Sequence, residues 1–190
     1  MATRTGSKTV LLVVDVQAGV VASAWQRDRV VANVAVAVDR ARAAGVPIVW
    51  VQHNDDELRR DTPEWQWVPE LKPLESESRI HKQFNSSFEE TPLLSLLEHH
   101  GVSHIVLAGA ASNWCIRATA YAALERGFDL TLVEDAHTTG DMELEPGRLV
   151  AAQSIVEDLN AVMRWISYPG RKSGVVHAAE LSFGSPAVAA

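Results

Sequence analysis

Three residues of this chain have side chains suited to nucleophilic chemistry, and each is predicted to lie at or just past the end of a buried strand. Asp15 closes the first predicted strand, Lys82 lies within or just after the third, and Cys115 follows the fourth. The carboxyl ends of the strands in an open α/β sheet form the crevice where ligands bind. Placed together there, a carboxylate could remove the thiol proton, an ammonium could hold the thiolate, and the sulfur could attack a carbonyl carbon.

Each residue alone also has a structural interpretation. A lone cysteine is often a small buried apolar residue, an aspartate can cap a helix or turn, and most lysines are solvated at the surface. Cys115, the one cysteine of the chain, is predicted in the first turn of a helix, where the dipole and free N–H groups favour a thiolate. Asp15 follows the apolar residues 10–14, so burying its carboxylate without a partner would be costly. The three residues together favour chemistry.

The elements that would position these side chains alternate between apolar runs and helical patterns, which is typical of βαβ units around a mostly parallel sheet. The predicted strands are residues 9–16, 47–53, 79–84, 104–109, 130–134 and 174–178. The predicted helices are residues 28–44, 92–100, 115–127 and 146–166. The polar segment 54–77 is expected to be irregular, with one helical turn around residues 63–71. We therefore expect an α/β protein with a three-layer Rossmann-like fold, a mostly parallel six-stranded sheet and helices on both faces.

Length and composition indicate one globular domain over residues 1–190, with a core at residues 8–166 and a C-terminal extension at residues 167–190. The hydrophobic fraction of 47% and the lack of an apolar stretch of ~18 residues are typical of a soluble protein. Residues 1–8 do not resemble a signal peptide, and a single cysteine excludes an internal disulfide, so we expect a cytoplasmic location. A net charge of −7 without a basic stripe argues against nucleic acid or an anionic membrane as partner.

Three segments carry a recognisable pattern at a specific spacing: residues 11–17 (LLVVDVQ), 82–88 (KQFNSSF) with 91–93 (TPL), and 107–115 (LAGAASNWC) followed by 117–120 (RATA). Together they resemble the isochorismatase-like cysteine hydrolases, a family that includes nicotinamidases, N-carbamoylsarcosine amidohydrolases and related amidases. The likeness extends over residues 9–139. It implies a hydrolase in which Asp15, Lys82 and Cys115 form a catalytic triad.

The resemblance also implies a non-proline cis peptide between Ala110 and Ala111. This bond would turn the N–H of Ala111 toward the same point as the N–H of Cys115, and the two N–H groups would form an oxyanion hole. The alternative is an ordinary trans turn of small residues.

The presence of the cysteine favours hydrolysis of a C–N bond, in an amide, ureide or cyclic amide of a small molecule, through a thioester intermediate. Family members that cleave the vinyl ether of isochorismate typically lack this cysteine, because no acyl group is transferred. Two alternatives remain open: a vinyl-ether hydrolase that uses Asp15 and Lys82 alone, and a catalytically idle oligomeric binding protein of the same fold. By likeness we also expect a homo-oligomer, a dimer or larger, in which the extension either reaches over a neighbouring subunit or packs as a surface tail.

The remaining candidates concern metal binding and the substrate pocket. His53 ends the second predicted strand and precedes an acidic cluster, but nicotinamidases carry an Asp-x-His here, whereas residues 51–53 are Val-Gln-His. We therefore expect neither a metal nor another cofactor, and we place His53 in the substrate pocket. Four more residues are candidates for the pocket: Trp25, Phe88, Asn113 and Trp114. The aromatic side chains could instead pack in the core or in a subunit interface, and Asn113 could cap the helix of Cys115.

Overall fold

The first strand shows why the sheet has helices on both of its faces. In β1 (Lys8–Val14), alternate side chains from Val10 to Val14 pack into one core cluster, whereas those of Leu11 and Val13 pack into the other. Successive side chains of a strand point to opposite faces, so a strand that is covered on both faces is apolar at every position. The continuous apolar run in the sequence is the consequence.

A computed structural model describes residues 3–183 of the chain. Six strands run parallel in the order β3-β2-β1-β4-β5-β8. The strands other than β1 are β2 (Ile48–His53), β3 (Ser78–Lys82), β4 (Val102–Ala110), β5 (Asp129–Thr138) and β8 (Ser173–Val176). The six strands predicted from the sequence are all present, and β8 shows that the segment predicted as a C-terminal extension completes the sheet. Residues 184–190 of that extension lie outside the described residues.

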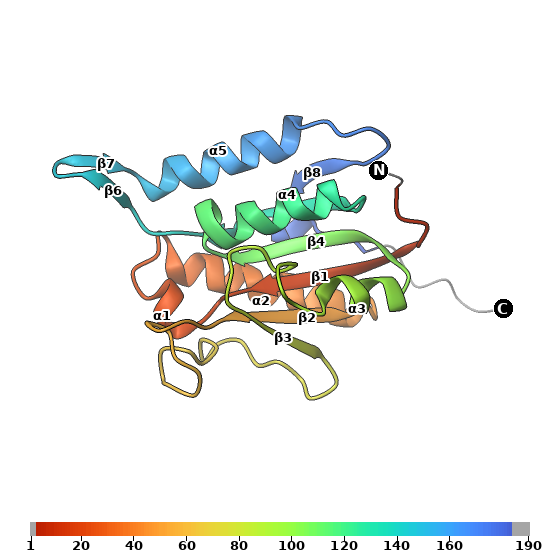
Figure 1. Ribbon diagram of the computed structural model, residues 1–190, viewed down its shortest axis with the longest axis horizontal. Helices are drawn as coiled ribbons and strands as arrows, with labels where there is room; N and C mark the ends of the chain where they lie inside the picture. Colours follow the sequence, from red (N-terminus) through yellow and green to blue (C-terminus); the bar gives the residue numbers. More distant parts are fainter. Residues whose placement is uncertain (1–2, 184–190) are drawn as a thin grey trace.

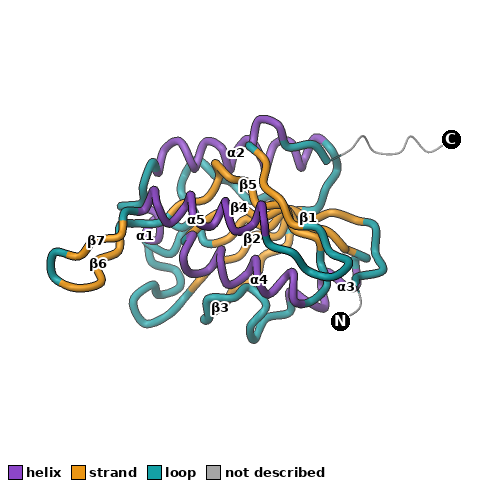
Figure 2. Tube along the Cα trace, turned by 90° about the horizontal axis from the view of Figure 1, so that it is seen from above, coloured by secondary structure: helices purple, strands orange, loops and turns teal. Residues whose placement is uncertain are grey.

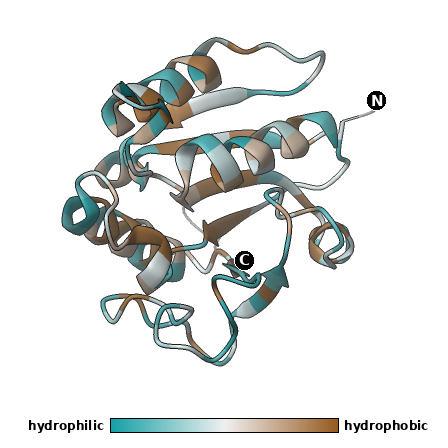
Figure 3. Cartoon of the chain, turned by 60° about the vertical axis from the view of Figure 1, so that its left-hand side comes forward, coloured by the Kyte–Doolittle hydropathy of each residue, from teal (hydrophilic) through white to brown (hydrophobic). Residues whose placement is uncertain are grey.

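The helices cover both faces of the sheet, as Figures 1 and 2 show. The helices are α1 (Ala18–Val21), α2 (Arg27–Ala43), α3 (Leu93–His99), α4 (Arg117–Glu125) and α5 (Ala152–Trp165). The long helix α2 lies on one face, and α3, α4 and α5 lie on the other. Apolar residues concentrate on the strands and on the helix sides turned toward them (Figure 3). The predicted α/β class with three layers is therefore confirmed.

The helix predicted over residues 146–166 is wrong in its first part. Met142–Glu145 (β6) and Arg148–Val150 (β7) form an antiparallel hairpin, and α5 begins only after it. Pro146 and Gly147 make the turn, in which Gly147 has a φ of 80°, a left-handed conformation that favours glycine. The hairpin projects beyond the N-terminal end of α5 (Figures 1 and 2).

Two further predictions differ from the structure. Ser112–Ile116 (η1) is a turn of π-helix that precedes α4. Cys115 therefore lies in a π-helical turn, a conformation that is frequent at functional sites, and not in the first turn of an α-helix. The helical turn expected around residues 63–71 is absent, and non-helical turns take its place. Pro69 in this segment has no N–H to donate to a helical hydrogen bond.

Candidate active site

Asp15, Lys82 and Cys115 come together at the carboxyl-terminal edge of the sheet. Lys82 Nζ lies 2.6 Å from Asp15 Oδ2 and 3.1 Å from Cys115 Sγ. Asp15 follows β1, Lys82 ends β3, and Cys115 follows β4 through the turn η1, so three parallel strands deliver them to one point. Their exposed fractions are 1%, 2% and 8%, respectively. A carboxyl group, an amine and a thiol therefore share one site that is almost closed to water.

The backbone around Asp15 and at the end of β4 has three unusual features. Asp15 has a φ of 51°, a left-handed conformation that aspartate tolerates better than most residues. The peptide between Ala110 and Ala111 is cis, which confirms that part of the expected pattern. Gly109 has a φ of 127°, and a Cβ atom there would lie 1.9 Å from the carbonyl oxygen of Val14. Only glycine allows the two strands to meet this closely beside Asp15.

The buried charges of Asp15 and Lys82 neutralise each other. Burial raises the pKa of Asp15 above its usual value, although the neighbouring ammonium of Lys82 opposes that rise. Burial alone would lower the pKa of Lys82, but Asp15 and Cys115 outweigh it, and the net shift is upward. Lys82 therefore keeps its proton, and Asp15 binds a proton more readily than an exposed aspartate does.

The thiol of Cys115 is neutral in the free protein. Burial and the negative charge of Asp15 raise its pKa to about 12, and Lys82 opposes this only in part. The expectation that the start of a helix favours a thiolate is wrong for this resting state, because removal from water and a nearby anion dominate.

The other predicted pocket residues relate to this site in different ways. His53, at the end of β2, reaches it directly, with Nδ1 3.3 Å from Lys82 Nζ. Trp114 directly precedes Cys115 in η1 and is 54% exposed. Asn113 accepts a hydrogen bond from Thr139 Oγ1 at 2.7 Å, and no side chain caps the start of η1. Asn113 therefore ties the turn to the end of β5 and does not cap a helix.

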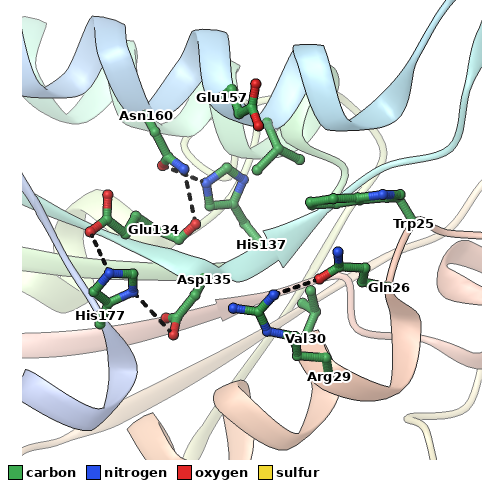
Figure 4. Close-up of a pocket in the computed structure, with 11 residues that line it drawn as sticks. Trp25, Gln26, Arg29, Val30, Glu134, Asp135, His137, Glu157, Asn160 and His177 are labelled. Carbon is green, nitrogen blue, oxygen red and sulfur yellow. Dashed lines mark hydrogen bonds and ion pairs between the residues drawn. The ribbon is translucent and has the colours of Figure 1, made fainter.

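Phe88 and Trp25, also predicted to line the substrate pocket, lie in the core and at a separate cavity, respectively. Phe88 is buried in the core with its ring 6.0 Å from that of Phe128, which agrees with the packing alternative. Trp25 lines a cavity of about 160 Å³ between α2, β5 and α5 (Figure 4). Among residues 3–183, Asp15, Lys82 and Cys115 do not line this cavity, so it is separate from their site.

Two buried residues that form hydrogen bonds with parts of the site were not predicted from the sequence. Gln17 is fully buried, and its side chain bonds both the N–H and the carbonyl of His53, at 2.8 and 3.0 Å. His137 is also buried; its Nδ1 lies 2.8 Å from Ser112 Oγ in η1, and its Nε2 lies 2.9 Å from Asn160 Oδ1. The rule that selects strand ends would have selected His137, but the fifth strand was predicted to end at residue 134 and ends at residue 138.

The acidic cluster after β2 forms local hydrogen bonds, and His53 Nε2 lies 2.9 Å from Asp55 Oδ2. Among residues 3–183, no group of three or more histidine, cysteine, aspartate and glutamate side chains could hold a metal ion. In the same part of the chain, no helix has the length and apolar character needed to cross a membrane.

Comparison with known proteins places the three ionisable residues inside a matched region. A family model of the isochorismatase domain matches residues 9–163. Streptothricin hydrolase of Streptomyces noursei is 38% identical over 144 residues, which are 72% of this chain and 57% of that protein, so the chain spans little more than half of this relative's length. Ureidoacrylate amidohydrolase RutB of Klebsiella pneumoniae is 29% identical over 174 residues, 73% of this chain and 70% of that protein. A crystal structure of an isochorismatase from Pseudomonas putida superposes with a TM-score of 0.81 and 28% identity, over 92% of this chain and 91% of that chain.

Proposed function

We propose that this chain, which belongs to the isochorismatase family, hydrolyses a C–N bond of a small molecule with Cys115 as the nucleophile. The observation that carries the proposal is the position of the Lys82 ammonium, 2.6 Å from the carboxylate of Asp15 and 3.1 Å from the sulfur. A base, a cation and a thiol at these distances are the groups that acyl transfer to sulfur requires. Membership of the isochorismatase family supports hydrolysis, and the roles of the three residues are our proposal.

In the proposed reaction, Asp15 removes the thiol proton as the sulfur of Cys115 attacks the carbonyl carbon. Lys82 stays protonated and stabilises the sulfur anion that forms as the proton leaves. The carbonyl oxygen gains the negative charge and accepts hydrogen bonds from the N–H groups of Ala111 and Cys115. The C–N bond then breaks, the nitrogen leaves with the proton that Asp15 held, and a thioester remains.

Water completes the proposed cycle. Asp15, again a carboxylate, removes a proton from a water molecule whose oxygen attacks the thioester carbonyl. The C–S bond breaks, the acid is released, and the sulfur of Cys115 takes the proton back from Asp15. The raised pKa of Asp15 suits a group that must both accept and donate this proton.

An amide, ureide or cyclic amide is the proposed substrate class. One relative is named an amidohydrolase, which supports C–N hydrolysis. A vinyl-ether hydrolase would transfer no acyl group and make no use of a thiol, whereas Lys82 contacts the sulfur of Cys115 directly. A catalytically idle binding protein would have no need for a buried ion pair beside that thiol, since burying charges is costly.

We also propose that the chain forms a homo-oligomer. Leu144 and Leu149 on the projecting hairpin are 47% and 60% exposed. A two-stranded hairpin is marginally stable alone in water, and exposed apolar side chains that gather together mark contact surfaces. Analytical ultracentrifugation should show an oligomer for the wild type and a weaker one for Leu149→Glu, and a monomeric wild type would contradict the proposal.

Release of ammonia or amine across a panel of primary amides, ureides and lactams tests the function. We expect the wild type to turn over at least one class, and Cys115→Ala to lose turnover by several orders of magnitude while its circular dichroism spectrum is unchanged. Intact-mass spectra of acid-quenched reactions should show the wild type carrying the acyl group. Hydrolysis by the alanine variant at the wild-type rate would exclude the thioester route.

A further inference from the structure

The buried ammonium of Lys82 has three N–H groups, and each needs an acceptor. The side chain is 0% exposed, so bulk water does not supply one. Asp15 Oδ2 lies 2.6 Å away as the ion-pair partner, and Cys115 Sγ accepts a hydrogen bond at 3.1 Å, so these two atoms face two of the three. Among residues 3–183, a further acceptor for the ammonium is Nδ1 of His53, 3.3 Å away on β2. His53 therefore completes the surroundings of the cation.

His53 Nδ1 can accept this N–H only if the imidazole carries its own proton on Nε2. Asp55 favours that form, because its Oδ2 lies 2.9 Å from Nε2. The other oxygen of Asp55 accepts the backbone N–H groups of Glu57 and Leu58, at 2.9 and 2.7 Å. The bond from Leu58 and then the bond from His53 lower the pKa of Asp55, which is therefore a carboxylate and accepts the Nε2 proton.

We propose that His53 and Asp55 are positioning residues for Lys82. Asp55 fixes the Nε2–H form of His53, and His53 holds the third N–H of the ammonium, so that the other two stay directed at Asp15 and Cys115. Gln17 holds the backbone of His53 on both sides and keeps the imidazole in place. The inference rests on the proposed function, because the ammonium must keep its orientation while the sulfur changes from thiol to thioester.

Asp55→Asn and Asp55→Ala distinguish this role from a structural role in the loop. In Asp55→Asn, the amide oxygen can keep the bonds from Glu57 and Leu58, but the NH₂ group then faces His53 Nε2. The imidazole must then carry its proton on Nδ1, where it points at the ammonium of Lys82. In Asp55→Ala, the imidazole can keep its Nε2 proton with water as acceptor. We expect the isosteric asparagine variant to be the more damaging one, which is the reverse of what a loop-stabilising role predicts.

His53→Asn and His53→Ala form a second pair. The amide oxygen of asparagine can occupy the place of Nδ1 and accept the same N–H of Lys82, whereas alanine offers no acceptor. The asparagine variant should therefore keep the Lys82 ammonium in place and keep the wild-type reactivity of Cys115, both of which the alanine variant should lose.

The rate at which iodoacetamide alkylates Cys115 at pH 9 reports on the site without any substrate. Lys82 lowers the pKa of the thiol, so a displaced ammonium slows the reaction. We expect Asp55→Asn and His53→Ala to react about tenfold more slowly than the wild type, and their partner variants to stay within about threefold of it. The matched control is Asp56→Asn, which removes a neighbouring exposed carboxylate and should react at the wild-type rate.

Long-range ¹H–¹⁵N NMR spectra of the histidine rings check the tautomer directly. The His53 signals, assigned by their loss in His53→Asn, should show Nε2–H in the wild type and Nδ1–H in Asp55→Asn. An Nδ1–H form in the wild type, or an Asp55→Asn variant that reacts as fast as Asp55→Ala, would overturn the inference. If the variants behave as expected but Cys115→Ala still hydrolyses amides, the proposed function fails and the positioning of Lys82 stands.

Discussion

Two hydrogen-bonded chains, each centred on a histidine, reach the turn that carries Cys115, and they differ in charge. The chain of His53 includes an ammonium and two carboxylates, and its outer end lies at the surface, where the side chain of Asp55 is 47% exposed. The chain of His137 includes only neutral groups. The comparison shows that the charged groups beside the thiol are paired with one another, whereas neutral groups hold the turn that carries it.

Burial explains why the second chain is neutral. His137 is 1% exposed, and burial lowers its pKa to about 4. Asn160 accepts the proton of Nε2, so Nδ1 is left to accept the hydroxyl proton of Ser112. Asn160 also donates to the carbonyl of Glu134 at 2.9 Å, which closes the chain on the backbone of β5.

The largest effect is expected from Asp15→Asn, which breaks the charged chain. The variant lacks the base and leaves the buried ammonium of Lys82 without its counter-charge. We expect kcat/KM for amide hydrolysis to fall by about 10²–10⁴-fold, and the free energy of unfolding in urea to fall by about 3–5 kcal/mol. Asp56→Asn again serves as the control. Activity above about a tenth of the wild-type value would show that another group is the base.

The next largest effect concerns the neutral chain and is a pH dependence of stability. The pKa of His137 falls from 6.5 to about 4 on folding, so between these values the unfolded chain binds more protons than the folded protein. The stability that the neutral form contributes is complete above pH 6.5 and is lost as the pH falls toward 4, by about 3 kcal/mol in total. Urea titrations from about pH 4.5 to 7 should show a shallower slope for His137→Gln, and equal slopes would refute the assignment.

A smaller effect is expected from Asn160→Leu, which opens the neutral chain at its far end. The Nε2 proton of His137 and the carbonyl of Glu134 lose their partners, at a cost of about 1–3 kcal/mol in the free energy of unfolding. Because the charged chain stays intact, we expect kcat to change by less than about tenfold. If activity fell as far as in Asp15→Asn, the two chains would not have separate tasks.

The ends of the strands show which parts of the site the local sequence pattern predicts and which it does not. The alternation of strand-like and helix-like segments predicts all six strands of the sheet, and the rule of carboxyl ends selects Asp15, Lys82 and Cys115. The same rule misses His137, because the polar residues Glu134 and Asp135 interrupt the apolar run before β5 ends. A proline and a glycine after residue 145 are compatible with a helix start as well as with a hairpin turn, and only the packing of the following segment decides between them.

The amino-acid sequence by itself determined the fold class, the family and the three residues that meet at the sheet edge, because these depend on side-chain types and their spacing along the chain. Only the tertiary structure decided the state of those residues. The neutral thiol of Cys115 results from burial and from the charge of Asp15, and the link between His53 and Lys82 results from the pairing of β2 with β3. Burial and distances between remote residues control protonation, and no local pattern encodes them.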